Sequence, residues 1–156
     1  MTWAFRRMTE ADLPLANGWI AGPEVARWWD EPVEADDLGE PDHRLWIAER
    51  EGAPVGFVQD YDPHAEPGHH FAHLPPGSRG LDLFLADPAG APRGEGSALL
   101  RAFADKLMAE GAPAVGGDPS PDNPRAIRAA EKAGFVLTGG PLETPWGVVL
   151  LMEKHA

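Results

Sequence analysis

The sequence lacks cysteine, holds a single tyrosine and contains no long apolar segment. Without cysteine, neither a disulfide framework nor a thiolate metal site is possible. The first residues, MTWAFRRM, lack the apolar run of a secretory signal peptide, and no stretch approaches the length of a transmembrane helix. The sequence therefore predicts a cytoplasmic protein that does not enter a membrane.

Basic side chains are also scarce. Lysine and arginine total 13 against 25 aspartate and glutamate residues, which gives a formal net charge of −12 at pH 7. Such acidity argues against nucleic acid as a partner and favours small cationic molecules. Seven carboxylates lie between Asp30 and Asp42 without a basic residue. They form either a solvated segment or a negatively charged rim that attracts an amine.

The chain is long enough for one core. With 156 residues, of which 43% are hydrophobic, it is predicted to form a single domain over residues 1–156. The pattern of elements is strand, short helices, three strands, helix, strand, helix and two strands, which is typical of a mixed α/β fold. The predicted strands are residues 2–8, 44–50, 55–61, 79–85, 112–117, 135–137 and 148–154, and the longer helices begin near Glu95 and Arg125.

A glycine-rich turn leads directly into the helix that begins near Glu95. Gly94 and Gly96 can adopt positive φ, and the first amides of the helix have no partner inside it. The turn is either a cradle for a phosphate or a tight loop before a core helix. A dinucleotide fingerprint needs a third glycine where Leu99 stands, and no Gly-Lys-Ser/Thr follows, so neither of these two common phosphate motifs applies.

Other side chains have two interpretations each. Trp28 and Trp29 are adjacent at the end of a short predicted helix from Pro23, so they point about 100° apart, and one of them either lines a pocket or packs at a helix edge. Arg125, Arg128 and Lys132 share one helical face, where they meet either ligand phosphates or acidic neighbours.

Three histidines, His69, His70 and His73, lie in a long loop over residues 62–78 that is rich in proline and glycine. The loop has neither a helix nor the carboxylate spacing that a metal centre needs, so no metal site is predicted. The histidines are expected to be exposed or locally packed, and their role stays open.

Several segments together resemble a known family. Arg93-Gly94-x-Gly96 before Ala98-Leu99-Leu100, then Asn123-x-x-Ala126 and Glu131-Lys132-Ala133-Gly134-Phe135, resemble the acetyl-CoA site of the GNAT superfamily of N-acetyltransferases. The similarity extends to aminoglycoside 6'-N-acetyltransferases and siderophore-type lysine acyltransferases. It is carried in the same order by MTEADL, by the paired tryptophans, by RGLD and most specifically by residues 118–135.

The resemblance implies a fold and a cosubstrate. The fold is α/β, with a mixed, mostly antiparallel central sheet that is splayed mid-sheet, between the RGLD strand and the strand before Asp118, and with helices on both faces. Acetyl-CoA is the implied cosubstrate, with its pantetheine arm in the splay. The implied cofactor-binding residues are Arg93, Gly94, Glu95, Gly96 and Ser97 at the pyrophosphate, Asn123 at the pantetheine arm, and Arg128.

The resemblance also implies a reaction. Acetyl transfer to a primary amine of a small cationic acceptor, aminoglycoside-like or polyamine-like, would use Asp82 as the general base, Asp118 as a contact to the amine and Trp29 in the acceptor pocket. These residue types suit the chemistry. An amine with a pKa near 10.4 is protonated at neutral pH, so carboxylates must bind the cation and then remove a proton.

The sequence departs from the family pattern at a few positions. Ala91 and Pro92 replace a polar residue and a glycine, and Pro92 removes one backbone donor from the turn. Glu95 places a carboxylate beside the expected pyrophosphate, where it is tolerated if it points to solvent or to Arg93. Ala130 stands where the superfamily often has the tyrosine that protonates the departing CoA thiolate.

Two alternatives to acetyl transfer onto a small cationic acceptor therefore remain. One is a catalytically degenerate protein that binds or senses acyl-CoA, and the other is a siderophore-type N-acyltransferase. The identity of the acceptor, the preferred acyl chain and the oligomeric state do not follow from the sequence.

Overall fold

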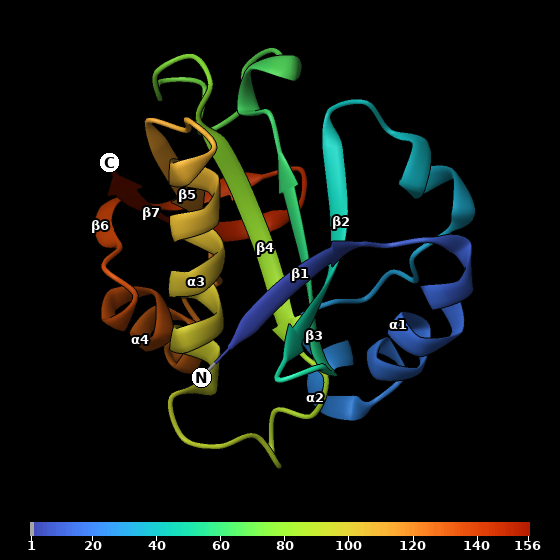
Figure 1. Ribbon diagram of the computed structural model, residues 1–156. Helices are drawn as coiled ribbons and strands as arrows, with labels where there is room; N and C mark the ends of the chain where they lie inside the picture. Colours follow the sequence, from blue (N-terminus) through green and yellow to red (C-terminus); the bar gives the residue numbers. More distant parts are fainter. Residues whose placement is uncertain (1) are drawn as a thin grey trace. The chain divides into compact units, whose positions relative to one another are not determined.

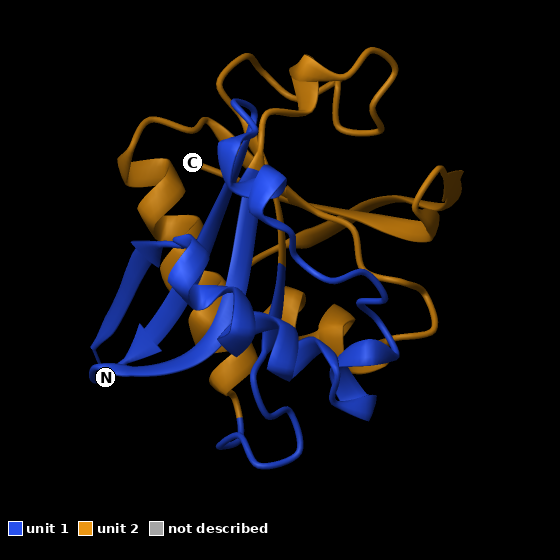
Figure 2. Ribbon diagram, turned by 90° about the vertical axis from the view of Figure 1, so that its right-hand side faces the viewer, with its two compact units in different colours: residues 1–60, 83–93 blue, residues 61–82, 94–156 orange. Residues whose placement is uncertain are grey.

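The computed structural model describes residues 2–156, which fall into two compact units (Figure 2). Unit 1 comprises the residues up to Asp60 together with Leu83–Arg93, and unit 2 comprises Tyr61–Asp82 together with Gly94–Ala156. The chain passes from one unit to the other after Asp60, after Asp82 and after Arg93, so each unit contains segments that are distant in sequence.

The elements follow the predicted order (Figure 1). Unit 1 and the strands at its boundary contain β1 (Trp3–Arg7), η1 (Glu10–Asp12), α1 (Leu13–Ile20), α2 (Pro23–Ala26), η2 (Ala35–Gly39), β2 (His43–Arg50), β3 (Ala53–Tyr61) and β4 (Arg79–Leu85). Unit 2 also contains η3 (Pro63–Ala65), α3 (Glu95–Ala109), β5 (Ala114–Gly117), α4 (Pro124–Lys132), β6 (Val136–Thr144) and β7 (Gly147–His155).

The strands are ordered β1-β2-β3-β4-β5-β7-β6 in a seven-stranded sheet. The pairs β1–β2, β5–β7 and β6–β7 are antiparallel, whereas β4 and β5 run parallel. The β4–β5 ladder registers Arg79 with Val115 and Gly80 with Gly116, and β4 then continues to Leu85. The predicted mixed, mostly antiparallel sheet is confirmed, and the short ladder fits a splay at the predicted place.

The core of unit 1 forms where α1, α2 and the strands β2 to β4 bring apolar side chains together. Phe57 and Phe84 stack with ring centroids 5.1 Å apart, and aliphatic residues such as Ile47 surround them. At the start of η1, Thr9 and Asp12 form a capping box. Arg6 donates two hydrogen bonds to Asp12, at 2.8 and 2.9 Å, and these bonds hold the pKa of that carboxyl below its usual value.

The helix predicted from Pro23 to the paired tryptophans is shorter than expected. It ends at Ala26, and the backbone N–H groups of Trp28 and Trp29 both donate to the carbonyl of Val25. A shared acceptor tightens the last turn instead of extending the helix. Pro32 follows closely, and the residue before a proline disfavours helical dihedrals. The two tryptophans therefore lie just after a helix.

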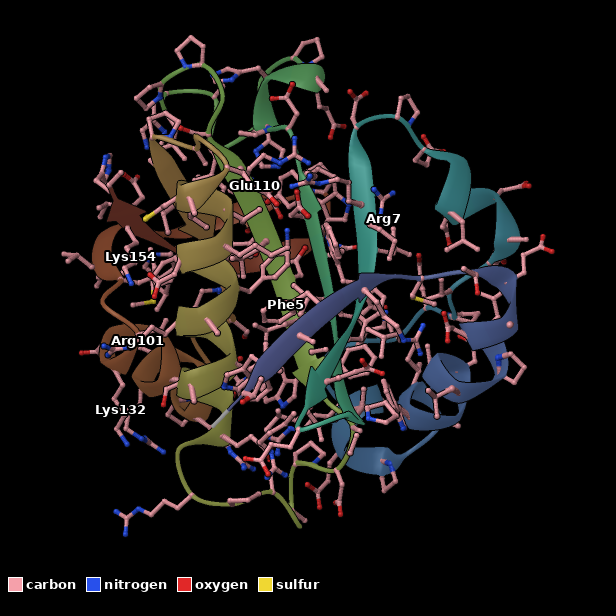
Figure 3. All side chains as sticks on the ribbon, in the orientation of Figure 1. Phe5, Arg7, Arg101, Glu110, Lys132 and Lys154 are labelled. Atoms are coloured by element: carbon pink, nitrogen blue, oxygen red, sulfur yellow. The ribbon has the colours of Figure 1, made fainter. Side chains whose placement is uncertain are left out.

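The core of unit 2 includes the buried face of α3. Leu99, Phe103 and Leu107 are spaced four residues apart and are all buried, as expected for one face of a helix. α4 lies beside α3 (Figure 1). Figure 3 labels the side chains that secure the end of α4. Arg101 donates to the carbonyl of Lys132, and Lys154 donates to that of Ala133 at 2.8 Å. These cations satisfy carbonyls that a helix C-terminus leaves unpaired.

Gly134 follows the C-cap residue of α4 and takes φ +98°, the left-handed conformation that glycine supplies at a helix end. Within residues 2–156, the structure has no helix with both the length and the apolar character to cross a bilayer.

Candidate active site

Two carboxylates face each other at the start of the splay. Because Gly80 pairs with Gly116 in the parallel ladder, residues two positions further along, Asp82 and Asp118, point to the same face and lie opposite each other. Their side chains are hydrogen-bonded to each other. Burial raises the pKa of Asp118 to about 6, and the hydrogen bond with Asp82 limits the rise. The sequence predicted both residues for the site, and the structure brings them together.

Two glycines make room for rings against these strands. A Cβ on Gly80 would lie 2.2 Å from Cζ of Tyr61, and a Cβ on Gly116 would lie 2.8 Å from the ring of Phe71. Only glycine permits this approach, so Gly80 and Gly116 fix the loop that begins at Tyr61 beside Asp82 and Asp118. Burial, together with those two carboxylates, raises the pKa of Tyr61 well above its usual value, and its hydroxyl stays protonated.

The histidine loop reaches the carboxylate pair through His70. Its Nε2 lies 2.9 Å from Oδ2 of Asp118, and the side chains of the two residues are 4% and 15% exposed. The ring of His69 stacks on that of His70 with centroids 4.0 Å apart. The backbone N–H of Phe71 donates to Nδ1 of His69 at 3.0 Å, which leaves the ring proton of neutral His69 on Nε2.

A pocket of about 110 Å³ opens beside these rings. It is lined by the histidine loop and by the β6–β7 turn, namely Glu66, Pro67, Gly68, His69, His70, Glu143, Thr144, Pro145 and Trp146. The indole of Trp146 lies 5.6 Å from the ring of His69 and 6.1 Å from that of His70. The aromatic rings and the carboxylates of Glu66 and Glu143 in this lining suit a cationic ligand. None of the pocket-lining residues was predicted for the site from the sequence.

Among residues 2–156, no group of three histidine, aspartate or glutamate side chains is placed to hold a metal ion. His73 contacts Glu153 instead, with 2.6 Å between its Nε2 and Oε2. Burial opposes the charge of Glu153, but hydrogen bonds from His155, His73 and Thr138 outweigh it and keep the pKa of that carboxyl below its usual value.

Comparison with known proteins identifies the family. Residues 8–140 match the acetyltransferase (GNAT) domain family. The chain belongs to this family. It is 33% identical over 163 residues to an aminoglycoside N(6')-acetyltransferase type 1 of Klebsiella pneumoniae, across 96% of this chain and 81% of the relative. The family resemblance stated from the sequence is thereby confirmed.

Solved structures agree with that assignment. The GNAT chain matches AAC(6')-Ib in complex with paromomycin and acetyl-CoA, with a TM-score of 0.87 and 30% identity over 99% of this chain and 94% of the other. It matches AAC(6')-Ib in complex with coenzyme A and kanamycin with a TM-score of 0.86 and 31% identity over 99% and 95%. The fold class predicted from the sequence is that of these acetyltransferases.

The glycine turn of this GNAT chain suits an anion. Gly94 has φ +84°, as predicted, and Ala98 donates to its carbonyl at 3.0 Å to close the first turn of α3. Gly96 lies inside that turn. A helix N-terminus presents amides that have no partner within the helix, and a backbone at positive φ without a Cβ lets a phosphate approach them. The residues present therefore fit the pyrophosphate of CoA.

Glu95 is buried in the first turn of α3. From the sequence, its carboxylate is tolerated beside the pyrophosphate if it points to solvent or to Arg93, and with the residue only 5% exposed it does not point to solvent. A carboxylate is favourable in the first turn of a helix because the helix dipole is positive there, which gives a physical reason for its position. Glu95 is therefore part of the first turn of α3 and not a solvent-facing side chain, while its role at the cofactor stays a prediction.

The remaining predicted residues have mixed positions. Asn123 caps α4, and its side-chain oxygen accepts from Ala126 N–H at 3.2 Å. Its side-chain NH₂ is the group that a pantetheine contact would use. Arg93 and Arg128 are exposed. Their roles and that of Ser97, whose hydroxyl donates to the carbonyl of Gly94, stay predictions.

Trp29 belongs to unit 1. Its ring packs edge-on against Phe57 and Phe84, with centroids 5.2 and 5.4 Å apart. This is the packing alternative of the sequence interpretation. Its place in the acceptor pocket remains a prediction.

The burial of Asp118 predicts a cost in stability. Its pKa is raised from the ordinary 3.8 to about 6, so the folded state prefers the protonated carboxyl. Ionisation of Asp118 therefore destabilises the fold, and this loss of stability is absent below pH 3.8 and complete above pH 6. Asp118→Asn is expected to raise the free energy of unfolding at pH 8 by up to about 3 kcal/mol, and by less at pH 5. Urea unfolding at both pH values measures this.

Asp122→Asn is the matched control, because Asp122 is exposed and lies four residues after Asp118. Its free energy of unfolding is expected to equal that of the wild type at both pH values. A destabilised Asp118→Asn at pH 8 would contradict the penalty inferred for the buried carboxylate.

Proposed function

We propose that this GNAT domain transfers the acetyl group of acetyl-CoA to a primary amine of a small cationic acceptor of the aminoglycoside type, with Asp82 as the general base. The observation that carries the proposal is the Asp82–Asp118 pair beside a pocket of rings and carboxylates. The relatives named aminoglycoside N-acetyltransferases, solved with kanamycin or paromomycin, support the choice of acceptor.

The residues account for each demand of the reaction. Glu66 and Glu143 at the pocket rim attract a polycation, and Trp146 offers a ring face to an ammonium group. One member of the Asp82–Asp118 pair must take a proton from the ammonium, because only the neutral amine has a lone pair. The amine nitrogen then bonds to the acetyl carbon and the carbon–sulfur bond breaks. The nitrogen loses its extra proton, and CoA leaves as the thiolate, which takes up a proton to become the thiol.

Acetyl-CoA would lie with its pyrophosphate on the amides after Gly94 and its pantetheine arm in the splay between β4 and β5. Arg93, Ser97, Asn123 and Arg128 are the side chains proposed to hold it. Use of acetyl-CoA is also the reason to propose a cytoplasmic location, since the cosubstrate must be supplied there. Residues 1–156 as one acetyltransferase domain likewise stay a proposal.

Binding of CoA can be tested separately from chemistry. CoA at 100 times its Kd is expected to stabilise the folded chain by about 2.7 kcal/mol, which a thermal-shift series measures. Gly94→Val is expected to remove most of this shift, because β-branched residues disfavour φ +84°. Gly94→Asn is the matched control, since asparagine tolerates that conformation. Equal shifts for both variants would contradict a cradle that depends on the backbone of Gly94.

Ala130 favours one alternative function. The residue is buried in α4 at the position where the family often has a thiol-protonating tyrosine. A chain without that acid could bind acyl-CoA as a sensor and not turn it over. In that case CoA would still give the thermal shift, but no amine would release thiol from acetyl-CoA.

A further inference from the structure

We propose that His70 is a positioning residue of the transfer reaction, which orients Asp118 beside Asp82, favours the ionised form of this carboxylate pair and connects the pair to the acceptor pocket. The inference rests on the proposed function and adds to it a residue that the family motifs do not include. It follows from three features of unit 2: a hydrogen bond, a clamped ring, and the charges that face the ring.

The hydrogen bond joins His70 to the carboxylate pair. Nε2 of His70 lies 2.9 Å from Oδ2 of Asp118, and Asp118 is hydrogen-bonded in turn to Asp82. The three side chains are therefore linked by consecutive hydrogen bonds. Both ends of the His70 contact are largely removed from water. A hydrogen bond to a charged group is stronger in such a place than at the surface.

The ring of His70 is clamped by aromatic neighbours. His69 stacks on it at 4.0 Å, and Phe71 lies at 4.8 Å with a tilt of 51° between the ring planes. Phe71 is itself fixed, because it is fully buried and its ring fills the space above Gly116. His70 also lines the pocket with Trp146. An acceptor in the pocket therefore contacts the same ring that holds Asp118.

The surroundings of His70 decide its charge. Burial lowers its pKa, and the carboxylates of Asp82 and Glu66 act in the opposite direction, whereas His73 lowers it further. The net pKa lies below the usual value of an imidazole, so His70 is neutral at pH 7. Tyr61, which also adjoins the carboxylates, keeps its proton. His70 is thus a neutral donor, and its Nε2–H can donate to ionised Asp118.

The contact between His70 and Asp118 sets the pH above which the carboxylate pair can act as a base. Burial pushes the pKa of Asp118 upward, and the hydrogen bond with Asp82 lowers it. A donor at the position of Nε2 of His70 likewise favours the ionised carboxylate. When the pair takes a proton from the acceptor, the N–H bond of the ammonium breaks and an O–H bond forms on a carboxyl oxygen. The proton then returns to solvent before the next turnover. Without His70, the Asp82–Asp118 pair would stay protonated to a higher pH.

The test is the pH profile of kcat/KM from pH 5 to 9, with kanamycin as acceptor, saturating acetyl-CoA and thiol release as the readout. His70→Phe keeps a ring but removes the donor, and we expect the acid limb to move up by about one pH unit. Activity should fall several-fold at pH 6.5 and recover by pH 9. His70→Gln retains an N–H donor and is expected to leave the limb near its wild-type position.

His64→Gln serves as the control. His64 lies in the same loop and contacts the carbonyl of Ala72 at 3.0 Å, outside the pocket, so its profile should match that of the wild type. An equal loss of activity at every pH in both His70 variants, with an unmoved acid limb, would overturn the proposal and leave His70 as a packing residue.

A second measurement does not depend on turnover. The ¹⁵N shifts of His70 between pH 6 and 8 should report a neutral ring with its proton on Nε2, and this signal should change in Asp118→Asn. A proton on Nδ1, or a signal that is indifferent to Asp118, would overturn the role of His70. Absence of thiol release by the wild type with every amine, despite the expected ¹⁵N signal, would instead refute the proposed function on which the catalytic role rests.

Discussion

Replacing Asp82 by asparagine is expected to lower kcat/KM for acetylation of an amine by about 10²- to 10⁴-fold. Asparagine has the same shape and can still hydrogen-bond to Asp118, but it cannot take a proton at neutral pH. The loss should therefore appear in turnover and not in CoA binding. Steady-state thiol release, together with the CoA thermal shift, separates the two effects.

Asp122→Asn is the matched control for this variant, because Asp122 is exposed in the segment that follows β5. Groups that act as a unit give non-additive losses, so Asp82→Asn combined with Asp118→Asn should be about as inactive as Asp82→Asn alone. Retention of most of the wild-type rate by Asp82→Asn would show that Asp82 is not the base.

Introducing tyrosine at position 130 is expected to have the second-largest effect. The family resemblance implies a hydroxyl there that protonates the thiolate of CoA, and a typical acid contributes roughly 10- to 100-fold in a reaction whose leaving thiol, with a pKa of about 8.5, already departs tolerably. Ala130→Tyr should therefore turn over about 10- to 100-fold faster than Ala130→Phe, with the difference greatest at low pH.

Phenylalanine is the appropriate reference because Ala130 is only 6% exposed. Either large ring costs about 1–3 kcal/mol of stability through overpacking, so the phenylalanine variant isolates the contribution of the hydroxyl. Equal rates for Ala130→Tyr and Ala130→Phe would show that a hydroxyl at this position does not act as an acid in the reaction. Activity that arises only in Ala130→Tyr would favour the sensor function for the natural chain.

Much of the fold could be predicted because its signals are local. The spacing of Leu99, Phe103 and Leu107 defines the buried face of α3, and glycine at position 134 marks the end of α4. The end of α2 was missed because the dihedrals after Val25 depend on a shared carbonyl rather than on propensity. The burial of Glu95 could not be predicted, because charge alone suggests exposure whereas a helix N-terminus accommodates a carboxylate.

The carboxylate pair could be predicted from motifs, but the pocket could not. Asp82 and Asp118 lie in recognisable segments, and their juxtaposition follows from the register of two short strands. His70 and Trp146 are far apart in sequence and sit in segments without periodicity. The one usable signal was glycine at positions 80 and 116, where a strand interior lacks side chains because the rings of Tyr61 and Phe71 occupy the space.

Acetyl transfer to an amine is tested most directly by one measurement. Purified chain, acetyl-CoA and kanamycin are incubated at pH 7.5, and thiol release is followed while the product is examined by mass spectrometry. We expect thiol release that requires kanamycin, a product with one acetyl group on an amine, and loss of both in Asp82→Asn. CoA binding without thiol release, for kanamycin and for a panel of other aminoglycosides and polyamines, would contradict acetyl transfer by this chain.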